Sequence, residues 1–154
     1  MVMKLGFRIK HYFYNAFREL FVHHHGSLAF RAKLYALMIA VNEDATVENF
    51  IIVKQQALKI YNNDTDRANL LLLSTKELVN KVKENNGLGI DSLIQSILHD
   101  LRAAPRYAKK IDVAALKAFL EHTYDDDTLA YQKNILEFLQ TLQDDTLEIK
   151  NNKV

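Results

Sequence analysis

The amino-acid sequence predicts an all-α fold of about seven helices, and three observations lead to this prediction. Apolar residues recur at steps of three and four along most of the chain, which is the periodicity of one buried helix face. The 154 residues include only four glycines and one proline, whereas folds built from many short strands need frequent Gly/Pro turns. Short clusters of Asn, Asp and Glu interrupt the apolar pattern, as is typical of turns between helices.

The length and composition indicate a single domain and exclude several classes of protein. A chain of 154 residues can bury a core without covalent cross-links. The absence of cysteine excludes disulfides, thiolate metal sites and cysteine nucleophiles, and it fits a reducing compartment. The longest apolar stretch, residues 34–41, is far below the ~20 residues of a membrane-spanning helix, and no signal peptide is evident. We therefore expect a cytoplasmic protein, with peripheral membrane association as an alternative.

The first half of the chain predicts three helices in succession. Residues 4–24 have the spacing of an amphipathic helix, and Ser27 is placed to cap a second helix over 28–42. The second half of that helix is apolar nearly all round, so we expect it at the centre of the core. Thr46 is a predicted N-cap for a third helix over 47–62.

Two short helices are predicted next, over 65–73 and 75–85, because Ser74 and Glu77 have the spacing of a capping box. Together they would bridge the third helix to the second half of the chain.

The second half continues the helical pattern. Ser92 is expected to open a helix that ends near Leu101, and Pro105 suits the first turn of a helix that runs to about Thr123. The last helix is predicted over 129–143, with Thr128 as its cap.

These elements divide the chain into three predicted parts. Residues 1–26 form a basic amphipathic N-terminal helix, residues 27–143 a helical domain, and residues 144–154 a polar tail that we expect to fray.

The two halves of the chain share a similar residue pattern when one is shifted by 82 residues relative to the other. In each half a core helix, an acidic Asp-x-Thr turn and a second apolar-faced helix follow one another, which predicts two pseudo-repeated helix pairs. The matched apolar positions are Ala32, Leu34, Ala36, Leu37, Met38, Val47, Val53, Ala57 and Ile60 with Ala114, Leu116, Ala118, Phe119, Leu120, Leu129, Ile135, Leu139 and Leu142.

The two stretches AKLYALMIAVNEDATVENFIIV and AALKAFLEHTYDDDTLAYQKNIL resemble the tellurite-resistance TerB-like family, over about residues 28–143. That fold also occurs as the N-terminal cytoplasmic part of membrane-anchored DnaJ-like co-chaperones. The resemblance implies a bacterial cytoplasmic interaction module linked to stress or to a membrane-associated assembly. The family's Asp-Gly turns, followed by Ser and then Glu, are degenerate here, because the downstream Glu positions hold Asn49 or Ile51 and Tyr131 or Lys133. The fold is therefore expected to carry over without the family's metal site.

Two groups of side chains are candidate metal ligands, although we expect no cofactor. Asp44, Asp126 and Asp127, on the acidic turns, have the oxygen ligands that Ca²⁺ or Mg²⁺ prefers. The competing interpretation is a solvated turn whose Asp caps the next helix. Residues 23–25 are three adjacent histidines that face different directions on a helix end, which favours a simple dipole interaction over a zinc site.

No motif for catalysis is evident, and the N-terminal segment is the predicted binding surface. The first 40 residues hold six basic residues and one acidic one, with aromatic residues interleaved. Basic aromatic helices bind anionic membranes or partner grooves, although the same helix can also pack on its own domain. We predict a non-enzymatic module that docks a protein partner or membrane surface; nucleic acid is not favoured, and a homo-oligomer stays open. The residues expected to make that contact are Phe7, Arg8, Phe13, Phe17 and Arg18. The alternative function is a metal-responsive domain, similar to tellurite-resistance proteins, that uses the acidic turns with Asp44, Asp126 and Asp127.

Overall fold

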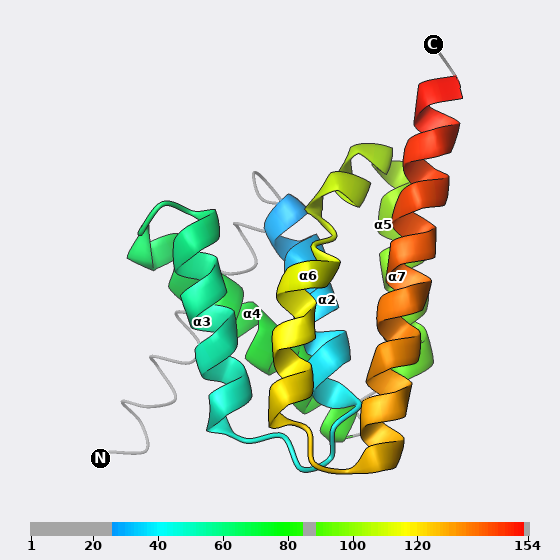
Figure 1. Ribbon diagram of the computed structural model, residues 1–154. Coiled ribbons are helices and arrows are strands. Elements are labelled where there is room, and N and C mark those ends of the chain that lie inside the picture. The colour runs from blue at the N-terminus through cyan, green and yellow to red at the C-terminus, as the bar shows by residue number, and fades with distance from the viewer. Residues whose placement is uncertain (1–25, 85–88, 153–154) are drawn as a thin grey trace.

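The computed structural model describes residues 26–84 and 89–152, and within these ranges every regular element is a helix (Figure 1). The predicted all-α class is confirmed. In chain order the elements are α2 (Gly26–Ala40), α3 (Val47–Ile60), α4 (Thr65–Lys83), α5 (Ile90–Ala103), the 3₁₀ segment η1 (Pro105–Lys110), α6 (Val113–Leu116), the 3₁₀ segment η2 (Lys117–His122) and α7 (Asp126–Asn152).

Helix α2 lies at the centre of the bundle, as its sequence predicts (Figure 1). Every residue from Leu34 to Ala40 is buried, because other elements surround the second half of this helix. It packs against α4, α5 and η1, and Phe30 near its start stacks on Tyr107 of η1 with 5.4 Å between ring centroids. An all-round apolar helix is stable only when it is enclosed in this way.

The region after α3 forms one helix, α4, where two short helices were predicted. Ser74, the expected cap between them, is fully buried and donates its hydroxyl hydrogen bond to the Leu70 carbonyl, 2.5 Å away. Thr75 does the same to the Leu71 carbonyl at 2.8 Å. Both hydroxyls donate to carbonyls of the preceding helical turn, so neither is used to cap the start of a second helix. The chain therefore continues as one helix.

The predicted single helix from Pro105 to Thr123 is wrong, because three short segments occupy this region. Pro105 does open η1, but the chain breaks at Ile111, and Asp112 caps α6 by accepting a hydrogen bond from the Ala115 N–H at 3.0 Å. Gln143 of α7 fixes the break by donating to the carbonyls of Ala108 and Ile111 at 2.8 and 2.7 Å. These bonds satisfy carbonyls that a continuous helix would have used internally.

Helix starts elsewhere also differ from prediction by a few residues. Helix α5 begins at Ile90 after Gly89, so Ser92 lies inside its first turn, and Ser27, the expected cap of α2, lies within that helix. Thr46 precedes α3 as predicted, although its side chain makes no capping hydrogen bond.

Helix α7 is longer than predicted at both ends. It starts at Asp126, and the cap is Asp125 instead of Thr128: the Asp125 carboxylate accepts hydrogen bonds from the backbone N–H and the hydroxyl of Thr128, at 2.9 and 2.7 Å. At the other end the helix continues to Asn152 instead of fraying after Asp144, because Leu142 and Leu147 pack against the core.

The Asp125 cap predicts a specific loss of stability in the variant Asp125→Ala. The hydrogen bonds from Thr128 lower the pKa of Asp125, so its contribution is present above the ordinary aspartate pKa and is lost as the pH falls through the lowered value. We expect Asp125→Ala to melt a few degrees below the wild type near neutral pH, with the difference closing in acid. Circular dichroism melts across pH measure this effect. The control is Asp127→Ala in the first turn of α7, and an equal loss there would contradict the capping role.

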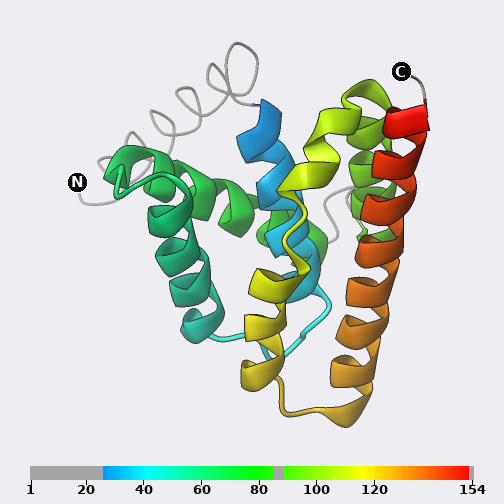
Figure 2. The same ribbon diagram turned by 45° about the horizontal axis from the view of Figure 1, so that its top comes forward.

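The two acidic corners, residues 41–46 and 123–125, lie at the same end of the bundle (Figures 1 and 2). Glu48 of α3 approaches His122 of η2 at 3.4 Å, and the Gln132 side chain of α7 donates to the Met38 carbonyl of α2 at 3.0 Å. The two corners are therefore joined across the bundle. Each corner leads from a core element into an apolar-faced helix, although the second core element is the short pair α6–η2.

Candidate functional site

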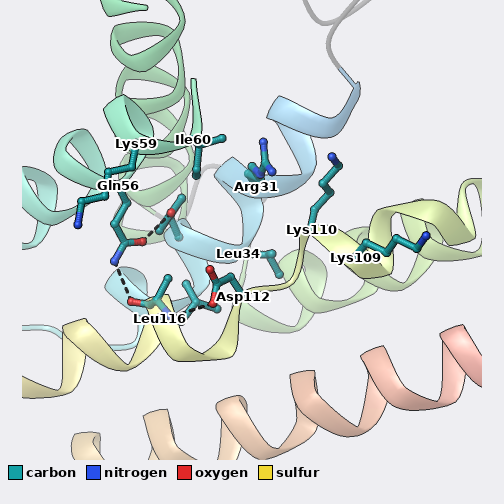
Figure 3. A pocket seen from close by; sticks show the side chains of 11 residues that line it. Arg31, Leu34, Gln56, Lys59, Ile60, Lys109, Lys110, Asp112 and Leu116 are labelled. Carbon is teal, nitrogen blue, oxygen red and sulfur yellow. Dashed lines mark hydrogen bonds between the residues drawn. The ribbon is translucent and has the colours of Figure 1, made fainter. Parts of the chain in front are cut away.

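A hollow of about 320 Å³ opens between α2, α3, η1 and α6, and we call it the basic pocket (Figure 3). Four of its lining side chains are cationic, one is a carboxylate and the rest are apolar or uncharged. The lining residues are Arg31, Leu34, Tyr35, Gln56, Lys59, Ile60, Lys109, Lys110, Asp112, Ala115 and Leu116.

A short chain of hydrogen bonds fixes one wall of the basic pocket. The Tyr35 hydroxyl donates to Gln56 Oε1 at 2.7 Å, and Gln56 Nε2 donates to the Ala115 carbonyl at 2.8 Å (Figure 3). Burial raises the pKa of Tyr35 above its ordinary value, so its hydroxyl remains a donor even in alkaline solution. This chain ties α2, α3 and α6 together and holds the wall in one arrangement.

The charges around the basic pocket are unbalanced. Its one carboxylate, Asp112, is engaged as the cap of α6. In the part of the chain that the structure describes, no carboxylate oxygen lies within 4 Å of a cationic nitrogen of the four lining cations, Arg31, Lys59, Lys109 and Lys110. These four positive charges therefore outnumber the negative one, and their field favours an anion at the mouth of the pocket.

The four cations differ in how they are placed. Figure 3 shows Arg31 and Lys110 extending to the same side of the pocket, whereas Lys59 and Lys109 extend away toward opposite sides. The Arg31 guanidinium also lies 5.8 Å from the centre of the Tyr61 ring, a cation–π distance that restrains its position. Arg31 and Lys110 are therefore the pair best placed to hold one anionic group, and a guanidinium can bind a carboxylate or phosphate with two parallel hydrogen bonds.

The structure does not gather the predicted acidic residues into a metal site. Asp44, Asp126 and Asp127 are all exposed, and Asp125, beside them, caps α7. Among residues 26–84 and 89–152, no group of three or more His, Asp or Glu side chains is arranged to hold a metal ion. The corner at 123–125 matches the capped, solvated turn that was the competing interpretation.

The predicted partner-binding residues, Phe7, Arg8, Phe13, Phe17 and Arg18, lie outside the described residues, as do the histidines at 23–25. Of the helices that the structure describes, none is both long enough and apolar enough to cross a membrane.

Sequence reasoning missed the basic pocket because its residues are far apart in the chain. Arg31, Gln56 and Lys110 come from three different elements, and the basic residues among them share no motif or spacing. The one local signal is the adjacent pair Lys109–Lys110 after Pro105, and by itself it does not distinguish a site from a solvated surface.

Comparisons of the chain with protein-family models, with curated proteins and with solved structures find no match. The resemblance to the TerB-like family therefore stays a prediction, and a function for this chain has to be inferred from the geometry of its described residues.

Proposed function

We propose that this protein is a non-enzymatic helical interaction module that holds an anionic group of its partner in the basic pocket. The group would be a carboxylate or a phosphate at the mouth of the pocket, held by Arg31 and Lys110. Its apolar attachment would lie against Leu34, Ile60 and Leu116 in the wall.

One observation carries this proposal: the pocket has four cations without a carboxylate partner among the described residues, while its single acid is engaged in capping α6. Elsewhere in the described chain three cations have a carboxylate partner, Lys33 with Asp100 at 2.6 Å, Arg67 with Asp64 at 3.7 Å and Lys81 with Glu77 at 3.5 Å, so what distinguishes the pocket is that four unpaired cations line one hollow. Unpaired cations gathered around a hollow with a fixed wall are what an anionic ligand requires.

The basic aromatic segment 1–25 directly precedes α2, the helix that carries Arg31. We propose that its residues Phe7, Arg8, Phe13, Phe17 and Arg18 add a second contact to a protein partner with an acidic surface. The bacterial, TerB-like and stress-linked setting belongs to this proposal through the family resemblance alone.

Isothermal titration calorimetry of the full chain with hexaglutamate peptide and with pyrophosphate tests the pocket. We expect saturable binding at low salt that weakens as salt is added, because the attraction is screened. The double variant Arg31→Gln/Lys110→Gln should weaken binding at least about tenfold, which corresponds to ~1.4 kcal/mol. Melting curves confirm that the variant is folded.

A charge-matched control separates the pocket from a general effect of net charge. Lys54→Gln/Lys133→Gln removes the same two charges from exposed positions outside the pocket, on α3 and α7. We expect this control to retain wild-type affinity. The proposal would be overturned if neither probe binds, or if both double variants lose affinity equally.

A further inference from the structure

A second hollow, distinct from the basic pocket, lies between the C-terminal parts of α5 and α7 and holds about 400 Å³. We call it the apolar groove. Most of its lining is hydrophobic, with two cations included, and the lining residues are Leu98, Leu101, Arg102, Pro105, Leu142, Thr146, Ile149 and Lys150. None of these residues lines the basic pocket.

The floor of the apolar groove offers apolar surface and few free hydrogen-bonding groups. The Thr146 hydroxyl is already used, because it donates to the Leu142 carbonyl at 2.6 Å. Ile149 is 58% exposed, which is high for a large aliphatic side chain on a helix face that is otherwise turned toward the bundle. A ligand in the groove would therefore gain mainly by covering Ile149 and the leucines.

The two cations lie at the same end of the groove. Figures 1 and 2 show α5 and α7 running in the same direction, and in Figure 1 the last turns of α7 continue past the end of α5. Arg102 and Lys150 are in the last turns of these helices, whereas Leu98 and Leu142 come one turn or more earlier. The groove thus has an apolar end and a cationic end.

Among the residues that line the groove, Arg102 and Lys150 are the charged ones, and none is acidic. Each helix C-terminus contributes a partial negative charge of about half an elementary charge, which is less than the full charges of Arg102 and Lys150 combined. Neither cation lies within 4 Å of a carboxylate oxygen in the described ranges. An anion at this end would therefore lie near two cations that have no carboxylate partner among the described residues.

We propose that the apolar groove binds an amphiphilic monoanion, an aliphatic carboxylate whose chain covers the leucines and whose head lies between Arg102 and Lys150. Its volume falls within the range of about 300–1,000 Å³ for small-molecule sites, which are mostly apolar with a few placed charges. A docked peptide helix would instead place charges along both edges of its apolar stripe. The grouping of both cations at one end favours the carboxylate.

Titration with sodium decanoate, monitored by methyl NMR of the full chain, tests this site. We expect saturable shifts of the Ile149 and Leu98 methyl signals, with little change at Ile51, an exposed isoleucine on α3. Decan-1-ol, with the same chain and no charge, should bind at least about fivefold more weakly. The double variant Arg102→Gln/Lys150→Gln should remove that preference for decanoate.

The matched pair Ile149→Asp and Ile51→Asp completes the test. Both positions are exposed, at 58% and 48%, so neither variant disturbs the core. Decanoate affinity should fall at least about tenfold in Ile149→Asp and stay unchanged in Ile51→Asp. Equal affinity for decanoate and decanol, unchanged binding in Ile149→Asp, or shifts only with an acidic amphipathic peptide would each overturn the proposal.

Discussion

Replacing Phe119 by alanine is expected to lower the free energy of unfolding by about 3–5 kcal/mol, the usual cost of deleting a buried phenylalanine ring. Phe119 is fully buried in η2, and its ring packs edge-to-face on Tyr35 of α2, with 5.9 Å between centroids. Phe119 is the buried residue of the six-residue segment η2, so this side chain anchors η2 to the core. Urea unfolding followed by circular dichroism measures the change.

The matched control is Phe138→Ala, because Phe138 is 39% exposed on α7. We expect a loss there well below that of Phe119→Ala, since less apolar area returns to water. Comparable losses in the two variants would contradict the burial of η2 against α2. Because Tyr35 also forms the wall of the basic pocket, Phe119→Ala should weaken pocket binding as well.

Gln132→Leu is expected to lower the free energy of unfolding by about 1–3 kcal/mol, although leucine is close in size and more apolar. Gln132 is fully buried; its Nε2 donates to the Met38 carbonyl at 3.0 Å, and its Oε1 accepts from the Thr123 hydroxyl at 2.7 Å. At the end of α2 the N–H groups of Val41 and Asn42 donate to Leu37 and Ile39. The carbonyl of Met38 therefore depends on Gln132.

The control is Gln55→Leu, at an exposed position on α3. We expect a change within about 0.5 kcal/mol there, as for most surface substitutions. Gln132→Glu should be worse than Gln132→Leu, because it places a carboxylate against the Met38 carbonyl in a buried site. Chemical denaturation of the three variants measures these differences. A Gln132→Leu variant as stable as the wild type would show that the Met38 carbonyl has another partner.

Helices whose apolar pattern is strong could be predicted from the sequence. The central position of α2 follows from its all-round apolar second half, and α3 follows from a clean amphipathic stripe after Thr46. The first acidic corner was correctly placed between helices, because a cluster of Asn, Glu and Asp interrupts the apolar pattern; of the second predicted turn only Asp125 lies between helices, since α7 begins at Asp126.

Elements that depend on tertiary contacts could not be predicted. The break at Ile111 and Asp112 is fixed by Gln143, more than thirty residues away, and the pattern of 105–123 alone favours a helix. The last turns of α7 look polar in sequence, yet Leu142 and Leu147 hold them to the core. The local residue pattern indicates only a preference for helix. In these segments tertiary packing determines where the helices begin and end.

The candidate site was invisible in the sequence for a related reason. Sequence reasoning followed the acidic corners and the N-terminal aromatic residues, because both are local clusters. The basic pocket depends on the fold to bring Arg31 and Lys110 together. In the structure Asp112, which follows Lys109 and Lys110 in the sequence, caps α6 and pairs with neither lysine.

The most direct test of the pocket as an anion site is the Nε–H signal of Arg31 in a ¹H–¹⁵N NMR titration with pyrophosphate at constant ionic strength. Arg67, an exposed arginine 3.7 Å from the Asp64 carboxylate, is the internal reference. If the pocket binds anions, the Arg31 signal will show a saturable shift while the Arg67 signal stays in place. An unmoved Arg31 signal, or parallel drift of both arginines, would contradict anion binding in the pocket.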